Sequence, residues 1–109
     1  FTLCYWSKYN LAKYFYFNGI PELKIKKNED LAIELLDDVC NYLIEACEEL
    51  IYIYYDKYIS SKRNKKKYLE QLNYYKTKCE LNINYNSTIK KRIEKNLIKL
   101  NDTNKINIP

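Results

Sequence analysis

The chain has 109 residues, of which 47% are hydrophobic, so it can bury a core and form one small domain. It contains no His and a single Gly, which excludes the commonest general base, most metal sites and glycine-rich phosphate loops. It contains no Met even at position 1, so we expect a processed product or part of a longer chain. Lys, Asn, Ile and Tyr dominate, which is typical of an AT-rich genome.

The net charge of +5 is unevenly distributed along the chain. Residues 29–56 carry acidic side chains and no basic ones, whereas the segments before and after them are basic. Because opposite charges attract, we expect both basic segments to pack against the acidic middle. No apolar run approaches the length of a membrane span, and the first residues lack the pattern of a signal peptide.

The first element that the sequence predicts is a helix over residues 2–17, with Thr2 as its N-cap. The run Asn-Gly-Ile-Pro at 18–21 predicts its end, because Gly adopts the left-handed conformation and Pro cannot continue a helix. After a connector, Asn28 is a typical N-cap. The two acidic residues that follow it would stabilise the helix dipole.

The strongest pattern in the chain predicts one continuous helix over residues 29–59. Apolar side chains recur there at alternating steps of four and three, which places them on one helical face. This apolar stripe consists of Leu36, Cys40, Leu43, Cys47, Leu50 and Tyr54. We therefore expect a long amphipathic helix that packs against its neighbours along its whole length.

The same spacing predicts a third helix over residues 65–82, with Ser61 or Asn64 as its N-cap. A turn rich in Asn follows, and a fourth helix is predicted over 88–101. The fold class that we expect is therefore all-α, a small bundle of three long helices plus a shorter fourth.

The domain boundaries follow from these elements. Residues 1–101 would form a single helical domain. Residues 102–109 would form a polar, frayed C-terminal tail.

The four cysteines, Cys4, Cys40, Cys47 and Cys79, are candidates for disulfide bonds. On a continuous helix Cys40 and Cys47 lie two turns apart, which exceeds the reach of a disulfide. If the first and third helices fold back on the second, the other two cysteines fall level with the gap between this pair. This favours Cys4–Cys40 with Cys47–Cys79, or Cys4–Cys47 with Cys40–Cys79, and an oxidising compartment. The alternative is four reduced thiols in the core.

The sequence offers no catalytic or metal-binding constellation. No nucleophile–base pair can form without His, and the widely spaced cysteines do not match a zinc site. Acidic pairs at helical spacing are typical of solvated helix faces; they are Glu34 with Asp37 or Asp38, and Glu45 with Glu48 or Glu49. We therefore expect neither an enzyme nor a bound cofactor.

Two groups of side chains are candidates for binding. Aromatic residues point all around the first predicted helix, so some would remain exposed as interface anchors. Basic residues cluster before the third helix and within the fourth, where they could contact phosphates, anionic lipids or an acidic protein. The candidates are Trp6, Tyr9, Tyr16, Lys62, Arg63, Lys65, Lys66, Lys67, Lys90, Lys91 and Arg92.

Three stretches around the break before the third helix form a recognisable series. They are Tyr55-Asp-Lys-Tyr58, Lys65-Lys-Lys-Tyr-Leu69 and Leu72-Asn-Tyr-Tyr75. A helix that ends in tyrosine, a short break and a basic, aromatic helix resemble the PHIST family of helical domains, which malaria parasites export into red cells. The resemblance covers about half of the chain. It implies a non-enzymatic protein-binding module and assigns no site residues.

The function that we expect is therefore a protein–protein interaction by a secreted or exported parasite protein. The partner would be a host or parasite protein. The alternative is a structural subunit of a large intracellular assembly, a ribonucleoprotein or a membrane complex, that docks through its basic C-terminal half. An anionic membrane surface is a further candidate partner, and nucleic acid is not the favoured one.

Overall fold

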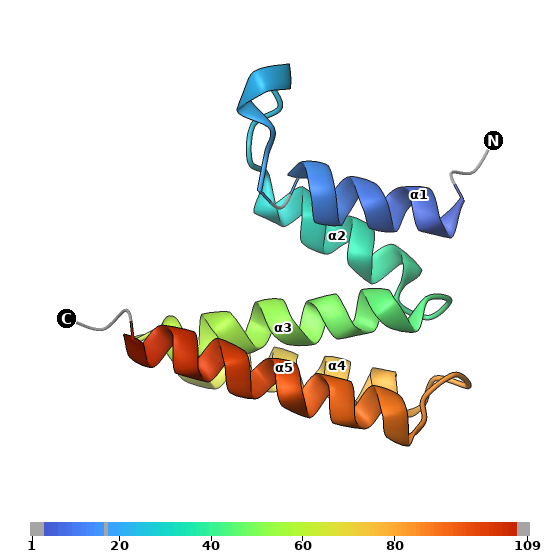
Figure 1. The fold of residues 1–109 in the computed structure, drawn as a ribbon, viewed down its shortest axis with the longest axis vertical. Helices are drawn as coiled ribbons and strands as arrows, with labels where there is room; N and C mark the ends of the chain where they lie inside the picture. Colours follow the sequence, from blue (N-terminus) through green and yellow to red (C-terminus); the bar gives the residue numbers. More distant parts are fainter. Residues whose placement is uncertain (1–3, 17, 107–109) are drawn as a thin grey trace.

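The structure, a computed structural model, describes residues 4–16 and 18–106. Over these residues the chain is helical apart from its turns and an isolated bridge between Ile20 and Ile25, which confirms the all-α class. Its α-helices are α1 (Tyr5–Asn10), α2 (Glu29–Val39), α3 (Ile44–Ser60), α4 (Lys65–Glu80) and α5 (Ser87–Ile106) (Figure 1). A π-helix, η1 (Leu11–Tyr16), continues α1, and a short 3-10 turn, η2 (Pro21–Leu23), lies in the connector.

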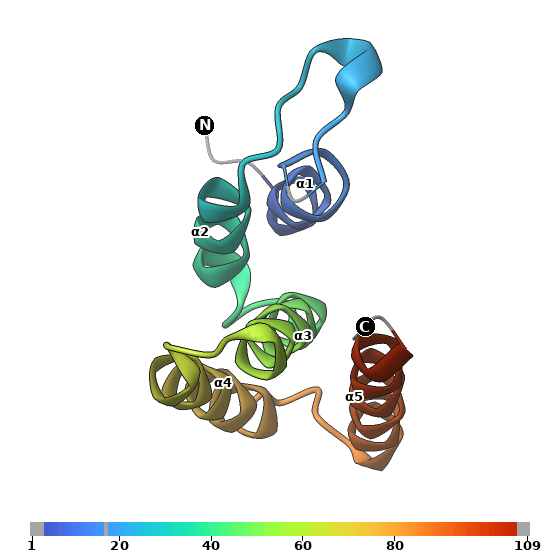
Figure 2. The same ribbon diagram turned by 90° about the vertical axis from the view of Figure 1, so that its left-hand side faces the viewer.

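Helix α3 lies at the centre of the fold. Helix α2 lies on one side of it and is covered in turn by α1 and η1 (Figure 2). Helices α4 and α5 lie on the other side, and both pack on α3. The connector that contains η2 extends away from the helices (Figure 1).

The charge distribution predicted this arrangement. Each ion pair found among the described residues joins a basic side chain of a flanking segment to an acidic one within 29–56. The pairs are Lys8–Asp38, Lys13–Glu49, Lys57–Glu29 and Arg92–Glu48.

The end of the first helical segment and the start of α2 agree with the sequence. Gly19 has a φ of 71°, the left-handed conformation expected after a helix. The Asn28 side chain accepts a hydrogen bond from the backbone N–H of Leu31 at 3.1 Å, which confirms it as the N-cap. Thr2 lies outside the described residues.

The continuous helix expected over residues 29–59 is wrong. The chain turns at residues 40–43 and divides this segment into α2 and α3. Leu43 is extended, with φ −125° and ψ 112°, and the turn is closed by a hydrogen bond from its N–H to the carbonyl of Val39. We call residues 40–43 the elbow.

The elbow has a physical reason in burial. Every residue of the predicted apolar stripe from Leu36 to Tyr54 is buried, so the pattern correctly identified core positions. A straight helix would carry the α2 half of the stripe away from the rest of the core. Folding at the elbow lets α2 bury its apolar face against both η1 and α3.

Helix α4 matches the third predicted helix, and its face of Leu72, Tyr75 and Cys79 is buried. Asn64 holds the N-cap position without a side-chain cap, whereas Ser61 accepts a hydrogen bond from the N–H of Asn64.

The last helix is longer than predicted. Helix α5 begins after Asn86, whose side chain caps it by accepting from the N–H of Ile89, and continues to Ile106. With 20 residues it is the longest described helix, so the expectation of a shorter fourth helix is wrong. The expectation of a frayed tail from residue 102 is also wrong as far as residue 106, because residues 102–106 are helical.

Candidate functional site

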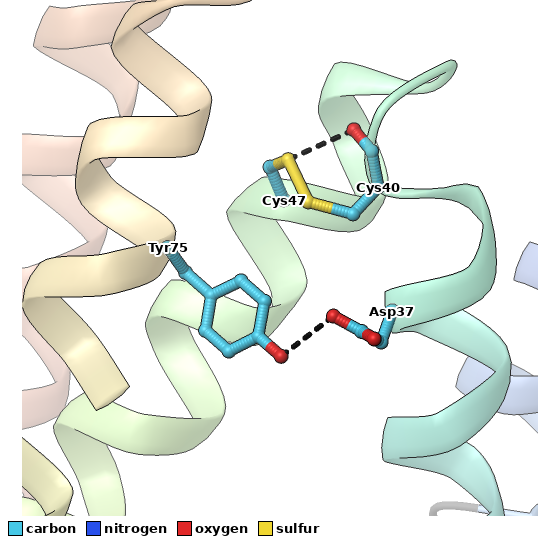
Figure 3. The surroundings of a disulfide bond; sticks show 4 residues. All are labelled: Asp37, Cys40, Cys47 and Tyr75. Carbon is cyan, nitrogen blue, oxygen red and sulfur yellow. Dashed lines mark hydrogen bonds between the residues drawn. A yellow bond between two sulfur atoms is a disulfide. The ribbon is translucent and has the colours of Figure 1, made fainter.

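The predicted disulfides between helices are wrong. Cys40 and Cys47 form a disulfide with a Cα–Cα distance of 4.9 Å, because the elbow replaces the helical turns that would have separated them (Figure 3). Cys4 is a free, exposed thiol, and Cys79 is a free, buried one. The disulfide therefore fixes the corner between α2 and α3 instead of stapling α1 or α4 to α3.

A hydrogen bond beside this disulfide connects the two sides of the fold. The Tyr75 hydroxyl on α4 donates to the Asp37 carboxylate on α2 at 2.7 Å (Figure 3). Burial and the nearby Asp37 raise the pKa of Tyr75. The Tyr75 ring also stacks on Tyr54 of α3, so one side chain contacts three helices.

The candidate aromatic residues of the first segment divide into core and surface. Tyr9 is buried at 7% exposure, and its ring packs edge-on against Trp6. Trp6 itself is 48% exposed. The side chain of Tyr16 lies outside the described side chains.

An exposed aromatic pair forms where α1 meets the elbow. The rings of Tyr5 and Tyr42 stack in parallel with centroids 4.4 Å apart, yet the two residues are 46% and 57% exposed. We call Tyr5, Trp6 and Tyr42 the aromatic surface. Sequence reasoning did not single out Tyr42, because it expected one continuous helix over residues 29–59 and Tyr42 is not part of its apolar stripe.

The basic segment at the N-terminal end of α4 is exposed. Lys62, Arg63, Lys66 and Lys67 all face solvent. Lys65 instead folds back over the end of α3, where its ammonium donates to the Tyr58 carbonyl at 3.0 Å and lies 4.6 Å from the centre of the Tyr58 ring.

The basic residues of α5 are not equivalent. Lys90 and Lys91 are exposed. The Arg92 guanidinium makes two hydrogen bonds to the Glu48 carboxylate of α3, and these hydrogen bonds raise the pKa of Arg92. Glu48 is 5% exposed, which corrects its expected place on a solvated face. Arg92 therefore compensates a buried charge, although its own side chain remains 48% exposed.

A polar hollow of about 240 Å³ surrounds this ion pair, between η1, α3 and α5. The Tyr52 hydroxyl donates to Glu48 at 3.1 Å and accepts from the Asn96 amide at 3.0 Å. Burial, assisted by Glu48, raises the pKa of Tyr52 to about 12. The polar side chains that line the hollow therefore form hydrogen bonds with one another.

On the far wall of the hollow, Lys13 bridges η1 to α3. Its ammonium lies 3.1 Å from Glu49 and donates to the Tyr9 hydroxyl at 3.3 Å. Burial alone would lower the pKa of Lys13, but its contacts with Tyr9 and Glu49 raise it overall. Lys13 and Glu49 therefore pair with each other within the fold.

The described residues contain no cluster of His, Cys, Asp or Glu that could hold a metal ion. Among the same residues, no helix has the length and apolar character needed to cross a membrane. Comparison with known proteins gave no significant match, whether to a family model, a curated protein or a solved structure.

Proposed function

We propose that this chain is a non-enzymatic protein-binding module of a secreted or exported parasite protein. The aromatic surface is the observation that supports this most. Tyr5, its sequence neighbour Trp6 and Tyr42 are each about half exposed, and the rings of Tyr5 and Tyr42 are held in a parallel stack before any partner binds. Tyrosine and tryptophan are the residue types that contribute most to the affinity of protein interfaces.

The rigidity of this corner supports the same proposal. Tyr42 belongs to the elbow, which the Cys40–Cys47 disulfide closes, and Tyr5 lies at the start of α1. Lys8 of α1 also pairs with Asp38 of α2 at 3.6 Å. A partner would meet preordered rings, so little conformational entropy is lost on binding. The disulfide is also typical of oxidising compartments, which supports export.

The test is a crosslinking experiment followed by reconstitution. A photoreactive group replaces Tyr42 in one variant and Tyr74, which is 54% exposed on α4, in a control. A host or parasite protein that is crosslinked only through position 42 is then purified. Tyr42→Ala should weaken its affinity about 30-fold, the effect of a hot-spot residue, while Tyr74→Ala leaves it unchanged. Equal weakening by both variants would refute the proposed surface.

A second candidate function is supported by the exposed face of α5. Lys91, Lys95 and Lys99 are exposed and four residues apart, so they share one side of the helix. Such a stripe fits docking to a polyanion within a large assembly, including a ribonucleoprotein. RNA binding that weakens steeply with salt, and that is lost when these lysines become Gln, would favour this function.

A further inference from the structure

The loop between α4 and α5, residues 81–86, presents two aliphatic side chains to solvent. Ile83 is 96% exposed and Leu81 is 81% exposed, more than any other large hydrophobic residue described as exposed. The fold gains almost nothing from them, because burial stabilises in proportion to the apolar area removed from water. The loop lies at one end of the molecule (Figure 1), and we call its two unburied aliphatic residues, which are separated by Asn82, the apolar tip.

The backbone of this loop is ordered by its own hydrogen bonds. The N–H groups of Leu81 and Asn82 donate to carbonyls of α4, and the N–H of Tyr85 donates to the carbonyl of Asn82. The N–H of Asn84 donates to the Asn82 side chain at 2.9 Å. Four backbone N–H groups of the loop are thus paired internally, which lowers the cost of moving it from water to a less polar medium.

Lysines lie on both sides of the apolar tip. Lys78 borders a shallow hollow together with Leu81 and Asn41 of the elbow. Lys90 borders the groove that contains Tyr85, and Lys91 beside it is exposed. Glu80 and Glu94 line that same groove beside Lys76 and Lys90, and Lys78 and Lys91 add two further lysines, so positive charge exceeds negative charge around the loop. Long lysine side chains can reach phosphate groups while neighbouring apolar groups insert deeper.

We propose that the α4–α5 loop is a membrane-contact site that inserts Leu81 and Ile83 into the interface of an anionic lipid bilayer. The shape favours a bilayer over a protein partner. The tip is convex and its side chains contact little of the fold, so a protein would need a matching cavity. A fluid bilayer accommodates such a tip without one, and anionic headgroups complement the lysines.

The first test measures binding of the whole chain to vesicles by sedimentation. Vesicles that contain phosphatidylserine should bind it, whereas pure phosphatidylcholine vesicles should not. The double change Leu81→Asn and Ile83→Asn should weaken binding at least tenfold. Because both side chains are exposed, the far-ultraviolet circular dichroism should not change.

The connector offers a matched control. Leu23 is 63% exposed and is also followed by lysines, but it belongs to the connector that contains η2, which extends away from the helices (Figure 1). Leu23→Asn should leave vesicle binding unchanged. If it weakens binding as much as the loop variant does, any exposed leucine near lysines suffices and the proposed site is wrong.

A second set of experiments tests whether the lysines contribute to vesicle binding. Lys78→Gln and Lys90→Gln should each weaken binding about fivefold, the contribution of one lysine near an anionic surface. Raising the ionic strength from about 0.1 M to about 1 M, which shortens the Debye length from about 10 Å to about 3 Å, should release the protein. Binding that is unaffected by these changes would contradict the proposal.

Insertion is tested with a fluorescent probe at the tip. The chain contains a single tryptophan, so Ile83→Trp in a Trp6→Phe background reports on the tip alone. Its emission should shift to shorter wavelength with anionic vesicles. An unchanged emission, or a native chain that does not bind these vesicles, would overturn the proposal.

The same variants separate this site from the proposed protein-binding function. Tyr42→Ala should leave vesicle binding intact, and the loop variant should leave capture of the crosslinked protein intact. If the loop variant instead abolishes binding of a protein or of a second copy of the chain, and vesicle binding is unaffected, the loop is a protein interface and the membrane proposal fails.

Discussion

Arg92 of α5 and Glu48 of α3 form an ion pair between residues 44 apart in the sequence, and this pair compensates the buried charged side chain described in the core. Asn96 of α5 adds a further polar contact with α3 through the Tyr52 hydroxyl. The pair therefore contributes strongly to holding α5 on the central helix.

Replacing Arg92 should destabilise the fold more than replacing its neighbour. Arg92→Ala leaves the Glu48 carboxylate buried without a cation, which we expect to lower the free energy of unfolding by about 1–3 kcal/mol. Urea denaturation measures this change. Lys91→Ala, at an exposed position, should stay within about 0.5 kcal/mol of the parent.

A second change at Glu48 makes the physical cause testable. Adding Glu48→Gln to Arg92→Ala removes the unpaired charge and should recover part of the lost stability. No recovery would mean that Arg92 contributes through packing alone.

The cysteines should differ in reactivity. Cys4 is exposed and should be alkylated in the native protein. Cys79 should react only after unfolding, since it is buried and burial, assisted by Glu48, raises its pKa to about 11. Cys40 and Cys47 should react only after reduction.

Mass spectrometry of native, unfolded and reduced samples reads out this order. Reduction should add two hydrogens to the chain. A gain of four hydrogens, with no alkylation of Cys4 before reduction, would instead indicate the disulfides between helices that the sequence favoured.

Stability should fall at alkaline pH because several tyrosines are buried. Burial raises the pKa of Tyr52 to about 12 and also raises those of Tyr54 and Tyr75. An unfolded tyrosine titrates near 10, so the unfolded chain releases these protons first and is favoured as pH rises. The free energy of unfolding should therefore be constant below about pH 9 and decrease from about pH 10 to 12.

Urea denaturation across this range, with phenolate absorbance as a second probe, checks the expected slope. Tyr75→Phe should reduce it. A slope that is identical in this variant would show that Tyr75 is not protected by the fold.

The single glycine should not tolerate a side chain. A Cβ on Gly19 would lie 2.6 Å from the backbone nitrogen of Lys27 and 2.9 Å from the backbone oxygen of Ile25. Gly19 also adopts a φ of 71°, which disfavours any residue with a Cβ. Gly19→Ala should therefore lower the free energy of unfolding by about 1–3 kcal/mol.

Lys24 provides the converse substitution in the same connector. It adopts a φ of 56°, which costs a residue with a Cβ about 1 kcal/mol. Lys24→Gly should leave the protein as stable as the parent or more stable in thermal unfolding. If both substitutions destabilise equally, backbone conformation is not what constrains this segment.

Local sequence spacing predicted the buried positions well. The stripe from Leu36 to Tyr54 is buried throughout, and α4 begins at the predicted residue. Apolar periodicity reports which side of a segment avoids water, and this information is contained within a few consecutive residues. The caps at Asn28 and the turn at Gly19 are local for the same reason.

The elbow could not be predicted in this way. Residues 40–43 contain neither Gly nor Pro, and the apolar period runs through them without interruption. The turn forms because α2 gains burial between η1 and α3, and these contacts arise only when the chain folds back on itself. The Cys40–Cys47 disulfide and the stacking of Tyr42 on Tyr5 both depend on this turn, so they were missed together.

The amino-acid sequence by itself determined that this protein is all-α, which side chains form its core and that its acidic middle pairs with basic flanks. Only the tertiary structure decided where the helices break, which cysteines meet and that Arg92 pairs with Glu48. The physical reason is the sequence separation over which each kind of interaction acts. Helical periodicity and capping act between residues up to four positions apart, whereas a turn without Gly or Pro, a disulfide and a buried ion pair depend on segments that only folding brings together.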